Sequence, residues 1–370
     1  MRKTIALILT VLIIFALSTE AFAEAKGTVL IDAESGRVLF SRNKDERLPM
    51  ASTTKIMTAL IALEQTDADE RFTVSGSAIA VEGSSMGLLP GDSVTLRVLA
   101  EGMLLASGND AANAAAVRVA GSVPAFVRLM NERAAELGMK NTSFMTPSGL
   151  DGERHCSTAY DMALLGRAAL QNPDFAAICG RVSMTAEYGN PPYRRELYNH
   201  NRLLRTLEGA TGVKTGFTKK AGRCLVSSAE RDGVKLICVT LGCPEDWDYH
   251  TRLYEDYFAV LKQTSLEHRV PAVTVPVTGG TANSVALYAK PVSAALFEGE
   301  EESITTVLST EPFLFAPVEH EAVAGWAYFF SNGMLIAKTP LVTKNSVEAK
   351  RYEKSFWHKI KDKFNFQENR

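Results

Sequence analysis

Three short motifs that lie far apart in this chain must meet in the folded protein if they act as one centre. They are Ser52-Thr53-Thr54-Lys55, Ser107-Gly108-Asn109 and Lys214-Thr215-Gly216. Each pattern alone is weak evidence, because short patterns of common residues recur by chance in a chain of 370 residues. Together and in this order, they are the components of a serine acyl-transferase that uses lysine as its base. The fold must therefore bring these three distant segments to one place.

The first motif can place a nucleophile beside a base. Residues 53–63 carry apolar side chains at helical spacing, so Ser52 would lie at the first turn and Lys55 one turn later on the same face. A serine hydroxyl is a poor nucleophile until a base removes its proton, and lysine can be that base once burial or a neighbouring cation lowers its pKa. Lys214 is the candidate cation. The alternative is that Ser52 only caps the helix.

A second stretch, Ser41-Arg42-Asn43-Lys44, also fits the Ser-x-x-Lys pattern. It lies in a polar, charged segment after a predicted strand, which indicates a turn in solvent. Ser52 is followed at once by an apolar helical run, so it can be both helix-initiating and buried. We therefore assign the nucleophile to Ser52.

The second motif lies between two predicted helices, where a turn can direct side chains into a cleft. Ser107 could pass a proton between Lys214 and a leaving amine. Asn109 could hydrogen-bond both Lys55 and the amide of a substrate. The alternative is an ordinary Ser-Gly-Asn turn with no role in chemistry.

The third motif precedes a strand-forming region, and an edge strand can bind an extended peptide by strand addition. Lys214 and Thr215 suit a carboxylate, one by charge and one by its hydroxyl. Gly216 removes a side chain where two backbones must approach. The backbone N–H groups of Ser52 and Phe217 could form an oxyanion hole. The alternative is a surface turn.

Apolar periodicity predicts helices in the middle of the first part of the chain and strands at both of its ends. The predicted helices are 53–63, 98–105, 111–120 and 124–137, and the predicted strands are 28–31, 37–40, 225–229 and 236–241. This is an α/β (α+β) pattern whose sheet joins distant segments. From about residue 265, alternating residues 271–277 and a hairpin at Asn332-Gly333 predict a small, separate all-β domain.

The N-terminus has the pattern of a secretory signal. Arg2 and Lys3 precede an apolar run from Ile5 to Leu17, and Ala21-Phe22-Ala23 offers a cleavage site. The run is short for a bilayer span, which needs ~20 residues. We expect residues 1–23 to be a signal peptide and the protein to be exported. An uncleaved signal anchor is the alternative.

Residues 344–370 differ from the rest of the chain by their positive charge. They hold eight Lys and Arg against four Asp and Glu, a net of +4 in a protein whose formal charge is −2. One face of a helix here would carry Tyr352, Phe356, Trp357, Ile360 and Phe364. A basic helix with an aromatic face is typical of a peripheral membrane anchor. The alternatives are a helix docked on its own protein and a disordered tail.

Composition and the number and spacing of the cysteines bear on nucleic-acid binding, disulfide formation and metal binding. A net charge of −2 argues against nucleic-acid binding. The chain has five cysteines, an odd number that cannot pair completely, and most are expected to be small buried thiols. A Cys224–Cys238 or Cys238–Cys243 disulfide remains an alternative. The five are Cys156, Cys179, Cys224, Cys238 and Cys243. No His/Cys cluster has metal-ligand spacing, so we predict neither a metal nor another cofactor.

Five stretches of the chain resemble the low-molecular-mass penicillin-binding proteins, the serine D-alanyl-D-alanine carboxypeptidases. They are residues 50–59, 105–112, 148–151, 157–162 and 211–218. The resemblance implies a β-lactamase/transpeptidase-like domain with an antiparallel sheet and a helical subdomain, followed by a β-rich domain and an amphipathic anchor. The implied division is a signal peptide at 1–23, a D,D-peptidase domain at 24–265, a β-rich domain at 266–343 and an anchor helix at 344–370.

The resemblance also implies a reaction. Ser52 would attack the carbonyl between the two terminal D-alanines of a peptidoglycan stem pentapeptide, and Lys55 would take its proton. D-Ala would leave, water would hydrolyse the acyl-enzyme, and penicillin would trap Ser52. The role would be cell wall maturation, and Asp246, Trp247 and His250 are similar to a variant in sporulation-associated members, which suggests the spore cortex.

One departure from the family pattern concerns the substrate's terminal carboxylate. Many members place an arginine after the third motif to help bind it, whereas here residues 243–250 stand in that region. His250 or Arg252 could substitute.

Three rival functions use the same components. A class A β-lactamase usually has Ser-Asp-Asn as its second motif and no added β domain, so this chain departs from it twice. A D,D-endopeptidase that cleaves cross-links stays open, because the choice of leaving group depends on the shape of the cleft. A non-catalytic receptor for β-lactams or muropeptides is less favoured, since Ser52, Lys55, Ser107 and Lys214 are all present.

Overall fold

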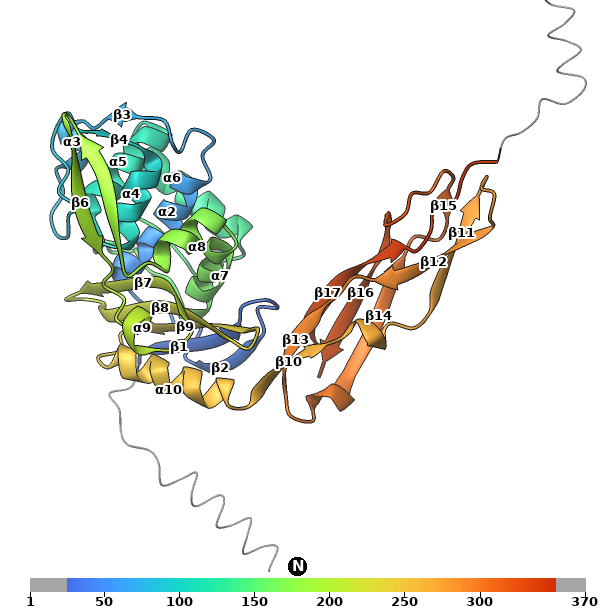
Figure 1. The fold of residues 1–370 in the computed structure, drawn as a ribbon. Helices are drawn as coiled ribbons and strands as arrows, with labels where there is room; N and C mark the ends of the chain where they lie inside the picture. Colours follow the sequence, from blue (N-terminus) through green and yellow to red (C-terminus); the bar gives the residue numbers. More distant parts are fainter. Residues whose placement is uncertain (1–24, 351–370) are drawn as a thin grey trace, which may run out of the picture. The chain divides into compact units, whose positions relative to one another are not determined.

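The structure, a computed structural model, describes residues 25–350 and divides into two compact units, the first ending at Lys262 and the second beginning at Gln263 (Figure 1). The first unit combines an antiparallel sheet with helices, and the second is all β. The predicted fold class is therefore confirmed.

The sheet of the first unit has five strands in the order β2-β1-β9-β8-β7, with every neighbouring pair antiparallel. The strands are β1 (Gly27–Asp32), β2 (Val38–Arg42), β7 (Ala210–Thr218), β8 (Gly222–Arg231) and β9 (Val234–Leu241). The predicted N-terminal hairpin and the strands at 225–229 and 236–241 are thus confirmed. Because β1 pairs with β9, the two ends of this unit meet in the centre of the sheet and leave β7 at one edge.

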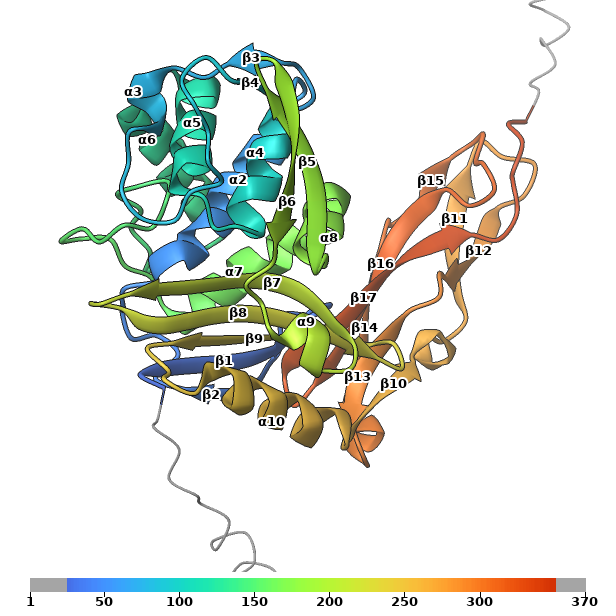
Figure 2. The ribbon, with the colours of Figure 1, turned by 60° about the vertical axis from the view of Figure 1, so that its left-hand side comes forward.

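A helical group packs over one face of this sheet, and one long helix covers the other face (Figures 1 and 2). The group contains α2 (Lys55–Leu63), α3 (Gly76–Ile79), α4 (Leu96–Leu104), α5 (Asn109–Ala120), α6 (Val123–Glu136), α7 (Ala159–Leu170) and α8 (Pro173–Cys179). Every residue of α2 is buried, which makes it the central helix. Threonine or serine side chains cap α4, α6 and α7, where Thr95, Ser122 and Thr158 accept from backbone N–H groups. The four predicted helices are confirmed within two residues at each end.

Two short strands and a hairpin complete the helical side. Strands β3 (Phe72–Thr73) and β4 (Ser93–Val94) pair with each other, as do β5 (Ser183–Gly189) and β6 (Pro192–Tyr198); α9 (Leu203–Thr206) follows. Tyr188 and Arg195 in the hairpin both donate to the carbonyl of Met86, at 2.6 and 3.1 Å. Our sequence analysis did not predict this hairpin.

The opposite face of the sheet is covered by α10 (Asp246–Phe258), which is attached through buried polar groups. His250 lies 2.7 Å from the Ser227 hydroxyl through Nδ1 and 2.9 Å from the Thr240 hydroxyl through Nε2. The Tyr254 hydroxyl also contacts Ser227 and accepts from the backbone N–H of Cys238. Burial lowers the pKa of His250 to about 3, so the ring is neutral in the folded protein.

The second unit has a six-stranded sheet in the order β14-β16-β17-β12-β11-β15. Its elements are β11 (Val273–Thr278), β12 (Ser284–Ala289), β13 (Ser293–Phe297), β14 (Ile304–Thr310), β15 (Leu314–Phe315), β16 (Val323–Ser331) and β17 (Met334–Thr343), and β10 (Leu261–Ser265) precedes them. Asn332 and Gly333 turn between β16 and β17 with φ of 49° and 78°, as the hairpin prediction requires.

Residues 344–350 belong to this β unit. Val347 is buried and exchanges backbone hydrogen bonds with Val318, and Lys350 donates to Gly279 at 2.8 Å. These residues are not helical, so the anchor helix predicted from residue 344 would begin no earlier than residue 351. Residues 1–24 and 351–370, which carry the predicted signal and most of the predicted anchor, lie outside the described residues.

Two further expectations concern cysteines and membrane spans. All five cysteines are free thiols, and four of them are buried. Within residues 25–350, no helix has the length and apolar character needed to cross a bilayer.

We predict that the stability of the first unit falls as pH drops from about 6.5 towards 3. The unfolded chain binds a proton at His250 below about pH 6.5, whereas the folded chain does not until about pH 3. The free energy of unfolding therefore falls by roughly 1.4 kcal/mol for each pH unit between these values. The His250→Asn variant should be less stable at pH 7, but its urea midpoint should approach that of the wild type at pH 4. A difference in midpoint that stays constant with pH would contradict this account.

Candidate active site

The three motifs meet at the edge of the sheet, around a cleft of about 280 Å³. Its lining comprises Ser52, Ser84, Ser107, His200, Thr215, Gly216, Phe217, Arg223, Asp246 and Trp247. Five of the eight predicted site residues are in this lining. The other three, Lys55, Asn109 and Lys214, are buried beside it.

Ser52 lies in a short 3₁₀ helix, η1 (Ala51–Thr54), that leads directly into α2. Lys55 donates to the Ser52 hydroxyl at 3.0 Å. The capping positions of these two helices are Met50 and Thr54, and neither side chain caps. Ser52 is therefore not an N-cap residue, and the Ser-x-x-Lys spacing brings hydroxyl and amine together as predicted. Ser41, of the competing pattern, lies exposed on β2 and is not in the cleft lining.

The Lys55 amine is completely buried among oxygen atoms. Besides Ser52, it contacts Asn109 Oδ1 at 2.7 Å and the carbonyl of Ser148 at 2.6 Å. Burial lowers the pKa of Lys55 well below its usual value, and the charge of Lys214 lowers it further. A neutral amine can accept a proton from Ser52, and the two remaining oxygens would then stabilise the ammonium that forms.

The Ser107-Gly108-Asn109 turn positions a hydroxyl and an amide from the start of α5. Ser107 has φ of +58°, a left-handed conformation that is rare for a residue with a side chain. Asn109 accepts from Lys55 and donates through Nδ2 to the carbonyl of Glu82 at 2.6 Å. It therefore joins the buried lysine to the loop that carries Ser84.

The third motif lies on the edge strand β7. Lys214 is buried and donates to the carbonyl of Thr215, and burial lowers the pKa of Lys214 to about 7. A Cβ atom on Gly216 would lie 2.9 Å from the backbone nitrogen of Ser52, so only glycine lets η1 approach β7 this closely. Phe217 follows with 66% of its surface exposed. The predicted oxyanion-hole groups thus come from adjacent segments.

Sequence reasoning assigned no role to the loop that supplies the Ser148 carbonyl. Gly149 has φ of +87°, and a Cβ atom there would lie 2.0 Å from the carbonyl oxygen of Ala51. His155 holds the same region: its Nδ1 accepts from the backbone N–H of Met145, so Nε2 carries the proton and donates to Thr54 Oγ1 at 2.8 Å. The family resemblance of residues 148–151 was the only sequence signal for this loop. It did not predict that a backbone carbonyl would face Lys55.

Asp110 is a second functional residue that the motifs did not single out. Its carboxylate accepts from the hydroxyl of Ser85 and from the backbone N–H groups of Met86, Gly87 and Leu88. It therefore fixes the segment that directly follows Ser84 of the cleft lining. The acidic residue directly after Ser107-Gly108-Asn109 was the only sequence signal for this role.

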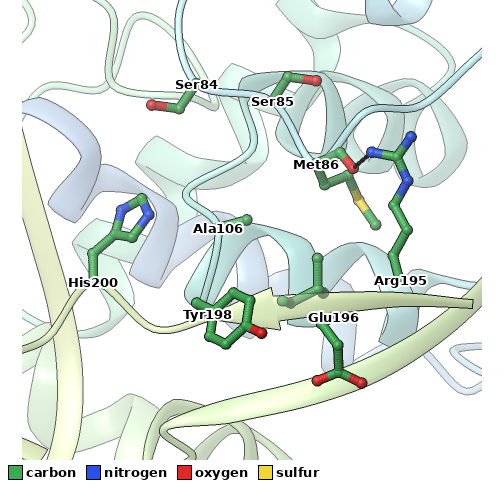
Figure 3. Close-up of a pocket in the computed structure, with 9 residues that line it drawn as sticks. Ser84, Ser85, Met86, Ala106, Arg195, Glu196, Tyr198 and His200 are labelled. Carbon is green, nitrogen blue, oxygen red and sulfur yellow. Dashed lines mark hydrogen bonds between the residues drawn. The ribbon is translucent and has the colours of Figure 1, made fainter.

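A second cavity of about 380 Å³ adjoins the cleft and shares two lining residues with it, Ser84 and His200 (Figure 3). Its other lining residues are Ser85, Met86, Ala106, Arg195, Glu196, Leu197 and Tyr198. Arg195 points to the carbonyl of Met86, as Figure 3 shows. Burial lowers the pKa of His200, and the nearby charge of Lys214 lowers it further. Ser107 lines the cleft, and its neighbour Ala106 lines the adjoining cavity.

Neither basic residue suggested for the carboxylate occupies the cleft. His250 is enclosed between α10 and the sheet and bonded to Ser227 and Thr240. Arg252 is exposed on α10 and is not among the lining residues. Residues 25–350 also contain no group of His, Cys, Asp and Glu that could hold a metal ion.

The fold and the site together define a serine acyl-transferase of the penicillin-recognising class. The fold is an antiparallel sheet packed against a helical group, and in the site a serine hydrogen-bonds to a buried lysine between the Ser-x-Asn and Lys-Thr-Gly motifs. Residues 16–245 match the family model for D-alanyl-D-alanine carboxypeptidase, and residues 263–349 match the model for the C-terminal domain of penicillin-binding protein 5. The chain belongs to the D-alanyl-D-alanine carboxypeptidase family and is a serine-type carboxypeptidase.

Individual relatives agree with this assignment over nearly the whole chain. D-alanyl-D-alanine carboxypeptidase DacF of Bacillus subtilis is 32% identical over 342 residues, 90% of this chain and 88% of the relative. Carboxypeptidase DacC of Escherichia coli is 36% identical over 360 residues, with 92% and 88% covered. The structure of penicillin-binding protein 5 from Haemophilus influenzae is 31% identical with a TM-score of 0.69, covering 88% of this chain and 97% of that one.

We predict that Gly149→Ala disrupts the site, because the new methyl group would collide with the Ala51 carbonyl and displace the Ser148 oxygen from Lys55. Gly138→Ala is the matched control: its φ is +76° and nothing lies within 4 Å of a Cβ atom there. Both variants should lose about 1 kcal/mol of stability to backbone strain. Only Gly149→Ala should also lower the acylation rate by penicillin, and equal rates in both variants would contradict this role.

Proposed function

We propose that Ser52 attacks the carbonyl carbon between the two terminal D-alanines of a peptidoglycan stem pentapeptide. The observation that carries the proposal is the 3.0 Å contact between Lys55 Nζ and Ser52 Oγ, made by an amine whose pKa burial has lowered. Lys55 takes the hydroxyl proton as the new C–O bond forms. The N–H groups of Ser52 and Phe217 stabilise the oxyanion.

The remaining steps release D-Ala and restore the enzyme. The C–N bond breaks, and Ser107 passes a proton to the leaving amine from the pair of buried lysines. Water then attacks the ester carbonyl with Lys55 accepting its proton, the bond between the acyl carbon and Ser52 Oγ breaks, and Lys55 returns the proton to Ser52 Oγ. A β-lactam that acylates Ser52 in the same way would remain attached for as long as that water attack is slow.

The choice of leaving group separates the carboxypeptidase from its closest alternative, a cross-link endopeptidase. The names of the relatives favour the carboxypeptidase. A purely binding receptor is less well supported, because Lys55 and Asn109 form a complete proton-accepting arrangement beside Ser52. We retain the spore cortex as a proposed setting on the sequence of residues 246–250 alone.

We also propose that the protein is exported and held at the outer face of the cytoplasmic membrane. The support is the signal pattern of residues 1–23 and the basic, aromatic composition that follows residue 350. The partner is then a membrane surface in addition to the stem peptide.

The nucleophile assignment is tested by comparing Ser52→Ala with Ser41→Ala, which alters the competing Ser-x-x-Lys pattern. Ser52→Ala should lose covalent labelling by benzylpenicillin and at least about a thousandfold in peptide hydrolysis. Ser41→Ala should keep both. Intact-mass measurement after incubation with benzylpenicillin reads the adduct directly. An adduct on Ser52→Ala of normal stoichiometry would refute the assignment.

The anchor is tested by ending the chain after Lys350 rather than earlier. The shortened protein should stay in solution when membranes are sedimented, while its hydrolysis rate and thermal midpoint match the full chain. Ending it after Thr343 should in addition destabilise the second unit, because Val347 and Ala349 pair with that unit. If the protein ending at Lys350 still sediments with membranes, the anchor lies elsewhere.

A further inference from the structure

Two phenylalanines are exposed at an edge of the six-stranded sheet in the second unit. Phe315 lies on the edge strand β15 and Phe313 comes just before that strand, with 70% and 45% of their surfaces exposed. Their ring centroids lie 5.1 Å apart with the rings nearly perpendicular. Leu314 between them packs against the core of the unit, because successive residues of an extended chain point to opposite sides. The two rings, called the aromatic pair below, therefore form one apolar projection.

The aromatic pair lies at the end of the second unit where the described chain ends (Figures 1 and 2). Phe315 pairs with Thr278 of β11, and the next residue, Gly279, accepts from the backbone N–H of Lys350 at 2.8 Å. One strand spacing, one step along the chain and one hydrogen bond thus place Phe315 within roughly 15 Å of Lys350.

This position puts the aromatic pair close to the predicted membrane anchor. The aromatic face predicted for the anchor begins at Tyr352, two residues after Lys350 and so at most about 7 Å further along the chain. An anchor that lies in the lipid interface therefore brings this end of the unit to the membrane surface. Exposed aromatic rings beside that surface lose contact with water by entering the interface.

The charges at this end of the unit indicate which force the contact would use. Glu311, Glu319 and Glu348 are exposed close to the aromatic pair in the chain or across the ladder, and the turn at residues 279–283 carries no charge. This end therefore offers little attraction to anionic lipid, which the basic residues after Lys350 would supply. A contact made by the rings would be apolar and insensitive to salt.

We propose that Phe313 and Phe315 form a second membrane contact, which enters the lipid interface beside the C-terminal anchor. The anchor alone would tether the unit through a flexible joint. Two contacts close together on one unit fix the direction in which that unit leaves the membrane. This inference rests on the proposed membrane attachment through the residues after Lys350.

The first test measures the binding of the full chain to phosphatidylcholine vesicles by co-sedimentation. Replacing the aromatic pair by Phe313→Ser with Phe315→Ser should weaken binding roughly 10-fold, by the same factor at low and at high salt. The matched control is Met334→Ser with Leu335→Ser. These two apolar side chains are also exposed but lie at the β16–β17 turn, at the opposite end of β17 from the residues that lead to Lys350. The control should bind as the wild type does.

The second test detects the lipid contact directly and does not depend on how well the serine variants fold. Phe315→Trp is made in a Trp357→Phe background, and its fluorescence is compared with that of the background protein. Vesicles whose acyl chains carry bromine should quench the added tryptophan and shift its emission to shorter wavelength. Leu335→Trp in the same background should be unaffected.

The outcomes separate this inference from the proposed attachment. If the wild type does not bind vesicles, the attachment itself fails. If the wild type binds but the loss of the aromatic pair leaves binding unchanged or stronger, the anchor acts alone or covers the pair, and the inference is overturned. Equal quenching of the two added tryptophans overturns it, and so does a dimer of the wild type in solution that the serine variant dissociates, because the pair would then bind a second copy.

Discussion

The buried amino group of Lys55 links three parts of the chain that are distant in sequence. Its hydrogen bonds reach Ser52 in η1, Asn109 at the start of α5 and the carbonyl of Ser148. An amine without such partners would be costly inside a protein, so the surrounding segments must hold their oxygen atoms in place. Asn109 then orders the Glu82 loop, and Gly149 lets the Ser148 loop lie against η1. Stability and chemistry therefore depend on the same contacts.

Burial also sets the electrostatics of the cleft. The pKa of Lys55 and that of Lys214 are both lowered mainly by loss of solvent, and the charge of Lys214 lowers that of Lys55 further. Two amines with lowered pKa values thus lie next to Ser52 and Thr215. Arg223 lies on the neighbouring strand and forms an ion pair with Asp246.

Much of the fold could be predicted because its signals are local. The apolar spacing of residues 53–63 is periodic, and Asn332-Gly333 has the backbone preference that a tight hairpin needs. Our sequence analysis missed the hairpin of β5 and β6, although residues 183–188 alternate between exposed polar and more buried apolar side chains; only the partner strand β6, which exposes most of its residues, lacks a clear pattern. The predicted anchor included residues 344–350 because their composition does not reveal that Val347 pairs with Val318.

Short sequence patterns were sufficient to identify the components of the site: a nucleophile with a lysine one turn later, a Ser-Gly-Asn turn and a Lys-Thr-Gly strand. Each depends on a spacing of a few residues, which helix and strand geometry convert directly into proximity. Which distant groups complete the site depends on how the helices and strands pack together. The carbonyl of Ser148 carries no side-chain signal, and the approach of Arg223 to Asp246 depends on how α10 crosses β8. Such contacts arise from packing between elements, which no short pattern encodes.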